Sequence, residues 1–222
     1  MRRLSKYIQM KLPLFPLQSI FFPGETVPLH IFEPRYKQLI NDCRAEAITF
    51  GIPVYINNGM DYGVEVQLVE VVTTYEKGEM DVVCVARQVF KLLSFEKQID
   101  DKLYSGGIIK LLDYDYEAEE SFKIEVLKKI RELYRVMQVS LSTVDVNKFN
   151  SFTLAHKMGL SFEQEYQLLQ MPKEMDRLTF IYHHLITTIK VLSEVERTRK
   201  TIELNGHFKN FDPLDFKDIE LQ

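Results

Sequence analysis

The chain has 222 residues, of which 45% are hydrophobic and 27% are charged, and its formal net charge is −4. This composition excludes a disordered or collagen-like chain and provides enough apolar material for a packed core. Up to Asp115 there are 13 basic and 15 acidic residues, and after it there are 15 and 17. Neither half has the positive excess typical of general nucleic-acid or anionic-membrane binders.

The few cysteines and the N-terminal segment bear on the cellular compartment. Cys43 and Cys84 are too few for a disulfide framework and lack metal-ligand spacing, so we expect two reduced thiols. Three basic residues stand near the start, but Pro13 and Pro16 break the apolar stretch that follows, and no cleavage site is present. No run of about 18 apolar residues occurs. We therefore expect a soluble, cytoplasmic protein.

The first half of the chain has the pattern of β structure. Residues 64–68 alternate between apolar and polar side chains, as a half-buried strand requires, and Lys77-Gly78 predicts a hairpin after them. Many short strands at close spacing favour a small barrel or a folded sheet. The expected segments are Leu12–Phe15, Ile20–Phe22, Val27–His30, Ile48–Tyr55, Val64–Thr74, Met80–Ala86, Val89–Phe95 and Ile108–Leu112.

One helix is expected within this β region. Glu33 stands at a capping position, and the fixed φ of Pro34 suits the first helical residue. An apolar face at helical spacing follows, made of Tyr36, Leu39, Ile40 and Cys43.

The second half changes to a helical period. Apolar residues at steps of 3, 4 and 1 predict a helix over 122–141 and a shorter one over 149–158, which Gly159 ends. Ser161 and Gln164 form a capping-box pattern that opens the next helix, and Pro172 ends it. A long last helix follows, with the apolar stripe Leu178, Ile181, Tyr182, Leu185, Ile189, Leu192 and Val195.

Three closely spaced motifs near the N-terminus are highly specific. They read Leu12-Pro13-Leu14-Phe15-Pro16-Leu17, then Phe22-Pro23-Gly24, then Pro28-Leu29-His30-Ile31-Phe32-Glu33-Pro34-Arg35-Tyr36. This stretch resembles the opening of the LON N-terminal, substrate-binding domain, which begins ATP-dependent Lon proteases and also occurs alone and in cereblon-type adaptors. The resemblance extends over roughly residues 11–195, through Gly51-Ile52, Tyr104-Ser105-Gly106-Gly107 and Leu168-Leu169 followed by Arg177-Leu178.

The resemblance implies an α+β fold: a PUA-like β pseudobarrel with one helix, then a helical bundle with a long last helix. We expect a LON-type β domain over 11–115, a helical subdomain over 116–203 and a loosely ordered tail over 204–222. One segment departs from the family pattern, because Ala86 and Val89 stand where Gly and Arg are usual. Without that Gly and that Arg, we do not expect a close backbone approach or an ion pair in this segment. The expected fold is unchanged.

Two modules of a complete Lon protease are missing from the sequence. No G-x-x-x-x-G-K-[ST] motif occurs, so no P-loop can hold a nucleotide triphosphate. The 19 residues after position 203 are too few for a protease domain. We therefore expect the recognition part of such a system, without catalytic residues and without a cofactor.

The strongest cluster of functional side chains is His30, Glu33 and Arg35, and it lacks a nearby nucleophile. We interpret it as structural: Glu33 caps the helix, and Glu33 or Arg35 forms a buried ion pair. The five histidines are scattered, and the adjacent His183 and His184 diverge by about 100° on a helix, so no metal site is predicted. No G-x-S-x-G or G-x-G-x-x-G motif occurs.

The functional prediction is a non-catalytic module that binds unfolded or degron-bearing polypeptides, as an adaptor to a separate ATP-dependent protease. Aromatic side chains near the barrel start, Phe22, Phe32 and Tyr36, are the predicted substrate-binding residues, whereas His30, Glu33, Pro34 and Arg35 are motif residues of the fold. RNA binding by a PUA-like barrel and an autonomous hydrolase are the alternatives. The acidic balance opposes the former, and the oligomeric state is left open.

Overall fold

The structure, a computed structural model, describes the backbone of residues 9–209 and the side chains of residues 9–204. Its six strands are β1 (Gln9–Leu14), β2 (Thr26–Ile31), β3 (Phe50–Pro53), β4 (Tyr62–Thr74), β5 (Met80–Glu96) and β6 (Ser105–Leu111). Its helices are α1 (Pro34–Glu46), α2 (Glu120–Val136), α3 (Phe162–Leu169) and α4 (Glu174–Lys209), with short 3₁₀ turns at Val146–Lys148 and Ala155–Lys157. The predicted α+β class is confirmed.

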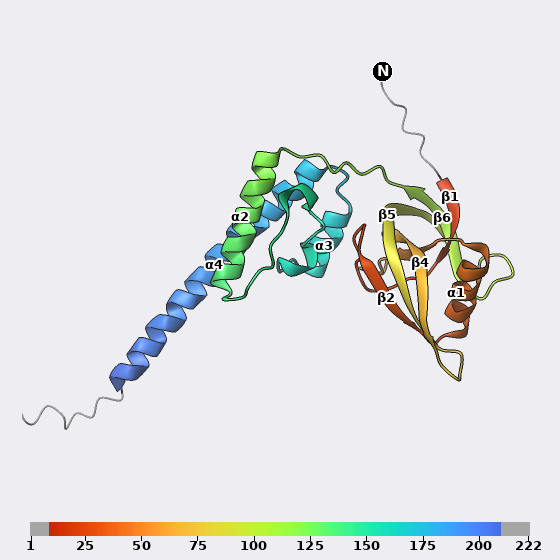
Figure 1. Ribbon diagram of the computed structural model, residues 1–222, viewed down its shortest axis with the longest axis horizontal. Helices are drawn as coiled ribbons and strands as arrows, with labels where there is room; N and C mark the ends of the chain where they lie inside the picture. The colour runs from red at the N-terminus through yellow and green to blue at the C-terminus, as the bar shows by residue number, and fades with distance from the viewer. Residues whose placement is uncertain (1–8, 210–222) are drawn as a thin grey trace, which may run out of the picture. The chain divides into compact units, whose positions relative to one another are not determined.

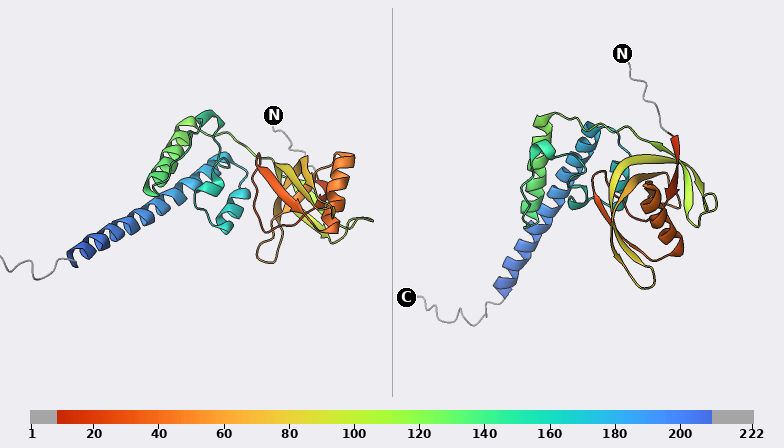
Figure 2. Two further views of the ribbon diagram at one scale, coloured as in Figure 1. Left: turned by 60° about the horizontal axis from the view of Figure 1, so that its bottom comes forward. Right: turned by 45° about the vertical axis from the view of Figure 1, so that its right-hand side comes forward.

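The six strands form one mixed sheet that closes nearly into a ring. Its order is β2-β5-β4-β3-β1-β6, and β5 also pairs with β6. The length of β5 makes this closure possible, because residues 80–85 pair with β2 while residues 90–96 pair with β6. β4 pairs with β5 along both parts. Figure 1 and the right-hand view of Figure 2 show the strands curving around α1.

Helix α1 supplies part of the core of this barrel. Its buried residues, Tyr36, Leu39, Ile40 and Cys43, are those that the helical spacing predicts. They pack in one cluster with strand residues such as Phe50, Val66 and Cys84. Pro34 occupies the first turn, as expected, and Ala47 ends the helix in the left-handed conformation with φ 53°.

The chain divides into two compact units. The first contains residues up to Ala118 together with 150–177, and the second contains 119–149 and 178 onward. Segment 150–177, which carries α3, thus belongs with the barrel, and the boundary after Arg177 falls inside α4. In the second unit, α2 packs beside α4 through Phe122 and Tyr182, whose ring centroids lie 5.7 Å apart.

Several predicted elements differ from the structure. Residues 20–22 form no strand, because they lie in the loop that leads to the turn at Gly24. The two segments predicted at 80–86 and 89–95 are one strand, β5. The helix predicted over 149–158 is replaced by turns, since the Asn150 side chain accepts a hydrogen bond from the amide of Phe152. Helix α2 ends at Val136 rather than near 141.

The capping box at Ser161 and Gln164 is confirmed, with both reciprocal hydrogen bonds present. Helix α4 runs to Lys209, and most of the tail predicted over 204–222 lies outside the described residues. No helix in the described part of the chain is long and apolar enough to cross a membrane.

Candidate functional site

The motif residues at the start of α1 form an exposed ion pair. Glu33 occupies the N-cap position, but its side chain makes no capping hydrogen bond. It accepts instead from Arg35, with the Nε and Nη2 atoms 2.8 and 2.7 Å from Oε2. The predicted side-chain cap is therefore wrong. The predicted burial of the ion pair is also wrong, because the Arg35 and Glu33 side chains are 49% and 37% exposed. The short Glu33–Arg35 spacing favours a local pair at the surface over a capping contact.

His30 belongs to a polar contact between neighbouring strands. It lies opposite Asp81 in the β2–β5 register, and its Nδ1 atom is 2.6 Å from Asp81 Oδ1. The Tyr75 hydroxyl donates to the other carboxylate oxygen at 2.6 Å. The hydrogen bonds from Tyr75 and His30 lower the pKa of Asp81 below its usual value.

An exposed aromatic patch surrounds this contact. Phe32 is 58% exposed, and its ring centroid lies 6.1 Å from that of His30. The ring of Tyr75 meets His30 edge-on at 6.0 Å. We call His30, Phe32 and Tyr75 the aromatic patch.

The other two predicted binding residues are buried. Phe22 is fully buried and stacks on Phe152 at 4.9 Å, while Tyr36 stacks on Phe15 at 3.8 Å. Both rings hold the loop and α1 against the rest of the first unit. Of the three predicted binding residues, Phe32 is the one whose side chain lies at the surface.

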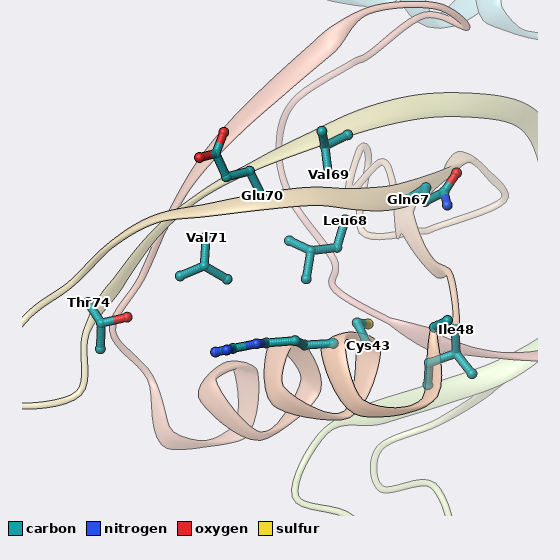
Figure 3. A pocket seen from close by; sticks show the side chains of 10 residues that line it. Cys43, Ile48, Gln67, Leu68, Val69, Glu70, Val71 and Thr74 are labelled. Carbon is teal, nitrogen blue, oxygen red and sulfur yellow. The ribbon is translucent and has the colours of Figure 1, made fainter.

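A groove lies between the C-terminal end of α1 and β4. Its volume is about 460 Å³. Figure 3 shows Leu68 and Val71 of β4 pointing toward α1, whereas Val69 and Glu70 point away from it. The lining residues are Cys43, Arg44, Ala47, Ile48, Gln67, Leu68, Val69, Glu70, Val71 and Thr74, and we call this the α1–β4 groove.

One edge of β4 is open where it borders the groove. Strand β3 runs antiparallel to β4 and pairs only with residues 63–66, since its first residue, Phe50, lies opposite Val66. From residue 67 to 74, in the part of the chain that the structure describes, β4 pairs only with β5. Register shifts near residues 69 and 72 interrupt this stretch, as is common on unpaired edges. The open edge therefore offers main-chain groups for short segments of partner strand.

The groove combines apolar side chains with one unpaired cation. Ile48, Leu68 and Val71 are partly buried and pack on the barrel core. Arg44 is exposed, and within the described residues it makes no hydrogen bond or ion pair. Burial raises the pKa of the Cys43 thiol to about 12, so this thiol stays protonated and is a poor nucleophile.

Sequence reasoning missed this groove, although a signal for it was present. The alternation of apolar and polar residues in β4 is lost after Leu68, where Val69, Val71 and Val72 follow in quick succession. In the structure Val69 and Val72 are 63% and 56% exposed. Such exposed apolar residues on an edge strand are typical of a binding surface.

These observations define a small barrel whose core includes helix α1 and which is followed by a helical segment. A groove lies beside the open edge of β4. Among the described residues no three His, Cys, Asp or Glu side chains are placed to hold a metal ion. Residues 11–187 match the family model of the ATP-dependent protease La (LON) substrate-binding domain. The chain therefore belongs to the LON substrate-binding domain family.

Two solved structures show the same fold. A Lon N-terminal domain protein from Xanthomonas campestris is 24% identical, with a TM-score of 0.59, over 77% of this chain and 95% of that one. The N-terminal domain of the Lon protease from the Mycobacterium avium complex is 16% identical, with a TM-score of 0.58, over 79% and 98%. A comparison with curated proteins found no match.

Proposed function

We propose that this LON substrate-binding domain recognises unfolded or degron-bearing polypeptides without catalysing a reaction, and that it delivers them to a separate ATP-dependent protease. The observation that carries the proposal is the open edge of β4 over residues 67–74, beside the α1–β4 groove. Family membership supports a substrate-binding role.

An extended segment lying along β4 would use two kinds of contact. Its main chain would pair with the free edge, and alternate side chains would point into the groove toward Leu68 and Val71. Main-chain pairing is independent of sequence, which suits a module that accepts many unfolded chains. The register shifts in β4 limit each paired stretch to a few residues.

The aromatic patch extends the same surface. Thr74 lines one end of the α1–β4 groove, and Tyr75 of the patch follows it directly in the chain. Phe32, at 58% exposure, adds a large apolar side chain there. A segment leaving the groove past Thr74 would meet these rings.

The first experiment measures binding by fluorescence anisotropy of a labelled, reduced and carboxymethylated polypeptide at low and high salt. We expect saturable binding that persists in high salt, because apolar and main-chain contacts carry it. Val71→Lys should weaken binding at least about tenfold, since it places a charge in the groove. Val72→Lys is the matched control on the same strand, because Val72 is 56% exposed and does not line the groove.

Both variants are first checked for a native circular dichroism spectrum and melting temperature. Equal affinity of the folded Val71→Lys variant and the wild type would exclude the α1–β4 groove as the binding site. Absence of saturable binding would reject polypeptide recognition altogether. Binding of labelled RNA that weakens steeply with salt would instead favour the RNA-binding alternative.

The adaptor role needs its own measurement. The rate at which a Lon-type protease degrades the same unfolded polypeptide is measured with and without this chain. We expect faster degradation with the wild-type chain and no acceleration with Val71→Lys. An unchanged rate with a chain that binds the polypeptide would reject the adaptor role and leave recognition standing.

A further inference from the structure

Helix α4 carries two apolar stripes, and α2 covers only one of them. The first stripe is buried within the second unit and consists of Leu178, Ile181, Leu185 and Ile189. The second stripe lies farther along the helix, where Val191, Val195 and Ile202 are 52%, 59% and 65% exposed. At about 100° per residue, the two stripes point roughly 120° apart on the helix.

The second stripe has the spacing of a coiled-coil seam. Val191, Val195, Thr198 and Ile202 are separated by steps of 4, 3 and 4, which places them at heptad positions d, a, d and a. The hydroxyl of Thr198 donates to the carbonyl of Glu194 at 2.9 Å. Its polar group is thereby satisfied, which leaves the methyl group available for packing. We call these four residues the α4 seam.

We propose that the α4 seam binds the α4 seam of a second copy of this chain, as a parallel two-stranded coiled coil. Val195 and Ile202 are β-branched, the residue type that parallel two-stranded coiled coils carry at position a, whereas position d holds Val191 and Thr198 instead of the usual Leu. The surface groove along this face is lined by the seam together with Glu194, Arg199 and Glu203.

The charged residues that flank the α4 seam favour a second copy of this helix as the partner and a parallel direction of the two helices. Glu194 occupies position g and Arg199 occupies position e of the next heptad, five residues later. In a parallel pair, position g of one helix faces position e of the next heptad of its partner, which brings Glu194 beside Arg199 of the other copy. Arg199 pairs with Glu203 of its own helix at 2.9 Å, so its guanidinium would be shared between the two carboxylates. An antiparallel pair brings g beside g and e beside e. The g residues are then Glu194 and Thr201, and the e residues are Leu192 and Arg199, so no opposite charges meet.

The seam spans three turns, so the dimer should be weak and concentration-dependent. Interfaces of this small area are typically transient, and we expect half-dimerisation at roughly 10–100 µM. Two features help the seam associate despite its length. Helix α4 is already formed, and its first stripe is held by α2, so little ordering accompanies association.

Sedimentation velocity of the full chain from about 1 to 500 µM tests the proposal. We expect the weight-average mass to rise toward that of a dimer, and Val195→Glu should abolish this rise. Leu204→Glu is the matched control, because Leu204 is 62% exposed and lies on another face of the same helix. Both changes are at exposed positions, and circular dichroism confirms that helix content is kept.

Charge reversal and cross-linking test the direction of the helices. Glu194→Lys should weaken the dimer, and adding Arg199→Glu should restore it. Val191→Cys should form a disulfide-linked dimer under mild oxidation, because identical d positions meet only in a parallel pair. A monomer at every concentration, or equal dimerisation of wild type and Val195→Glu, would overturn the proposal. Loss of polypeptide binding in Val195→Glu with an unchanged mass would assign the seam to a different partner and overturn it too.

Discussion

Arg177 and Glu174 form an ion pair in which neither side chain is exposed to solvent. The Nη2 atom of Arg177 lies 2.7 Å from Oε2 of Glu174, and the Nε atom lies 3.0 Å from the same oxygen. The remaining donors of the guanidinium reach the carbonyls of Met171 and Asp115 at 2.7 and 2.6 Å. Ser151 donates to Glu174 through both its amide and its hydroxyl.

This network joins two separate segments of the first unit. The segment after β6 contributes Tyr114 and Tyr116, and segment 150–177 contributes Phe152. The ring centroids of Tyr114, Tyr116 and Phe152 lie 5.0, 5.4 and 4.6 Å from the guanidinium carbon of Arg177. A buried charge is tolerated when its hydrogen bonds are complete, and here each side chain is fully paired. Arg177 therefore fixes α3 and the start of α4 within the barrel unit.

Replacing Arg177 should strongly destabilise the chain. Arg177→Met leaves Glu174 as a buried, uncompensated carboxylate, and we expect a loss of about 3–5 kcal/mol in the free energy of unfolding. Urea denaturation followed by circular dichroism measures it. Arg131→Met on α2, at an exposed position, should change stability by less than about 0.5 kcal/mol. The double variant Arg177→Met/Glu174→Leu should recover part of the loss, and a double variant no more stable than Arg177→Met would contradict this account.

His156 provides a pH-dependent contact within the first unit. Hydrogen bonds to Glu165 and then Glu25, at 2.9 and 3.2 Å, raise the pKa of His156 to about 10. The folded state thus binds the proton more tightly than the unfolded state, whose histidine has a pKa of about 6.5. The stabilisation is complete below about pH 6.5 and is lost as the pH rises toward 10.

The measurement is urea denaturation of the wild type and His156→Gln from pH 6 to 10. The stability difference between the two proteins should be largest at pH 6 and should shrink with rising pH. Because the His156 side chain is 38% exposed, solvent screening limits the change to about 1 kcal/mol. A difference that stays constant over this range would show that the two carboxylates do not hold the proton.

Both cysteines should be inert in the folded protein. Burial raises the pKa of Cys43 and of Cys84 to about 12, so almost no thiolate exists near pH 8. Ellman's reagent at pH 8 should therefore label neither thiol over minutes and should label both in 8 M urea. Rapid reaction of Cys43 in the folded protein would show that the α1–β4 groove opens to solvent there.

Gly63 is required where β4 pairs with β3, opposite Pro53. A Cβ atom there would overlap the carbonyl oxygen of Ile52 and lie 2.5 Å from the Cα atom of Pro53, both of which belong to the backbone. Gly63→Ala should cost about 1–3 kcal/mol of stability, measured by urea denaturation. Gly59→Ala, whose Cβ would meet its nearest atom at 3.7 Å, is the control and should change stability little. Equal stability of the two variants would contradict this close approach of the β3 backbone to Gly63.

Two local signals in the sequence were reliable, since neighbouring residues alone decide the structure there. These are Pro34 at the start of α1 and the Ser161–Gln164 capping box, because their hydrogen bonds and dihedral limits act within one turn. The LON-type motifs likewise identified the family. The helix predicted over 149–158 was wrong: there the local contact of Asn150 with the amide of Phe152 is joined by hydrogen bonds from Ser151 to Glu174, a residue 23 positions away.

The sequence by itself determined the class of fold, since binary patterning and turn residues act locally. Tertiary structure decided which aromatic side chains are accessible: Phe22 is buried by Phe152, 130 positions later, whereas Phe32 remains exposed. It also decided the open edge beside the α1–β4 groove, because β3 begins at Phe50, opposite Val66, while β4 continues to Thr74. An open edge arises from the unequal lengths of paired strands, and no local pattern encodes which strands pair.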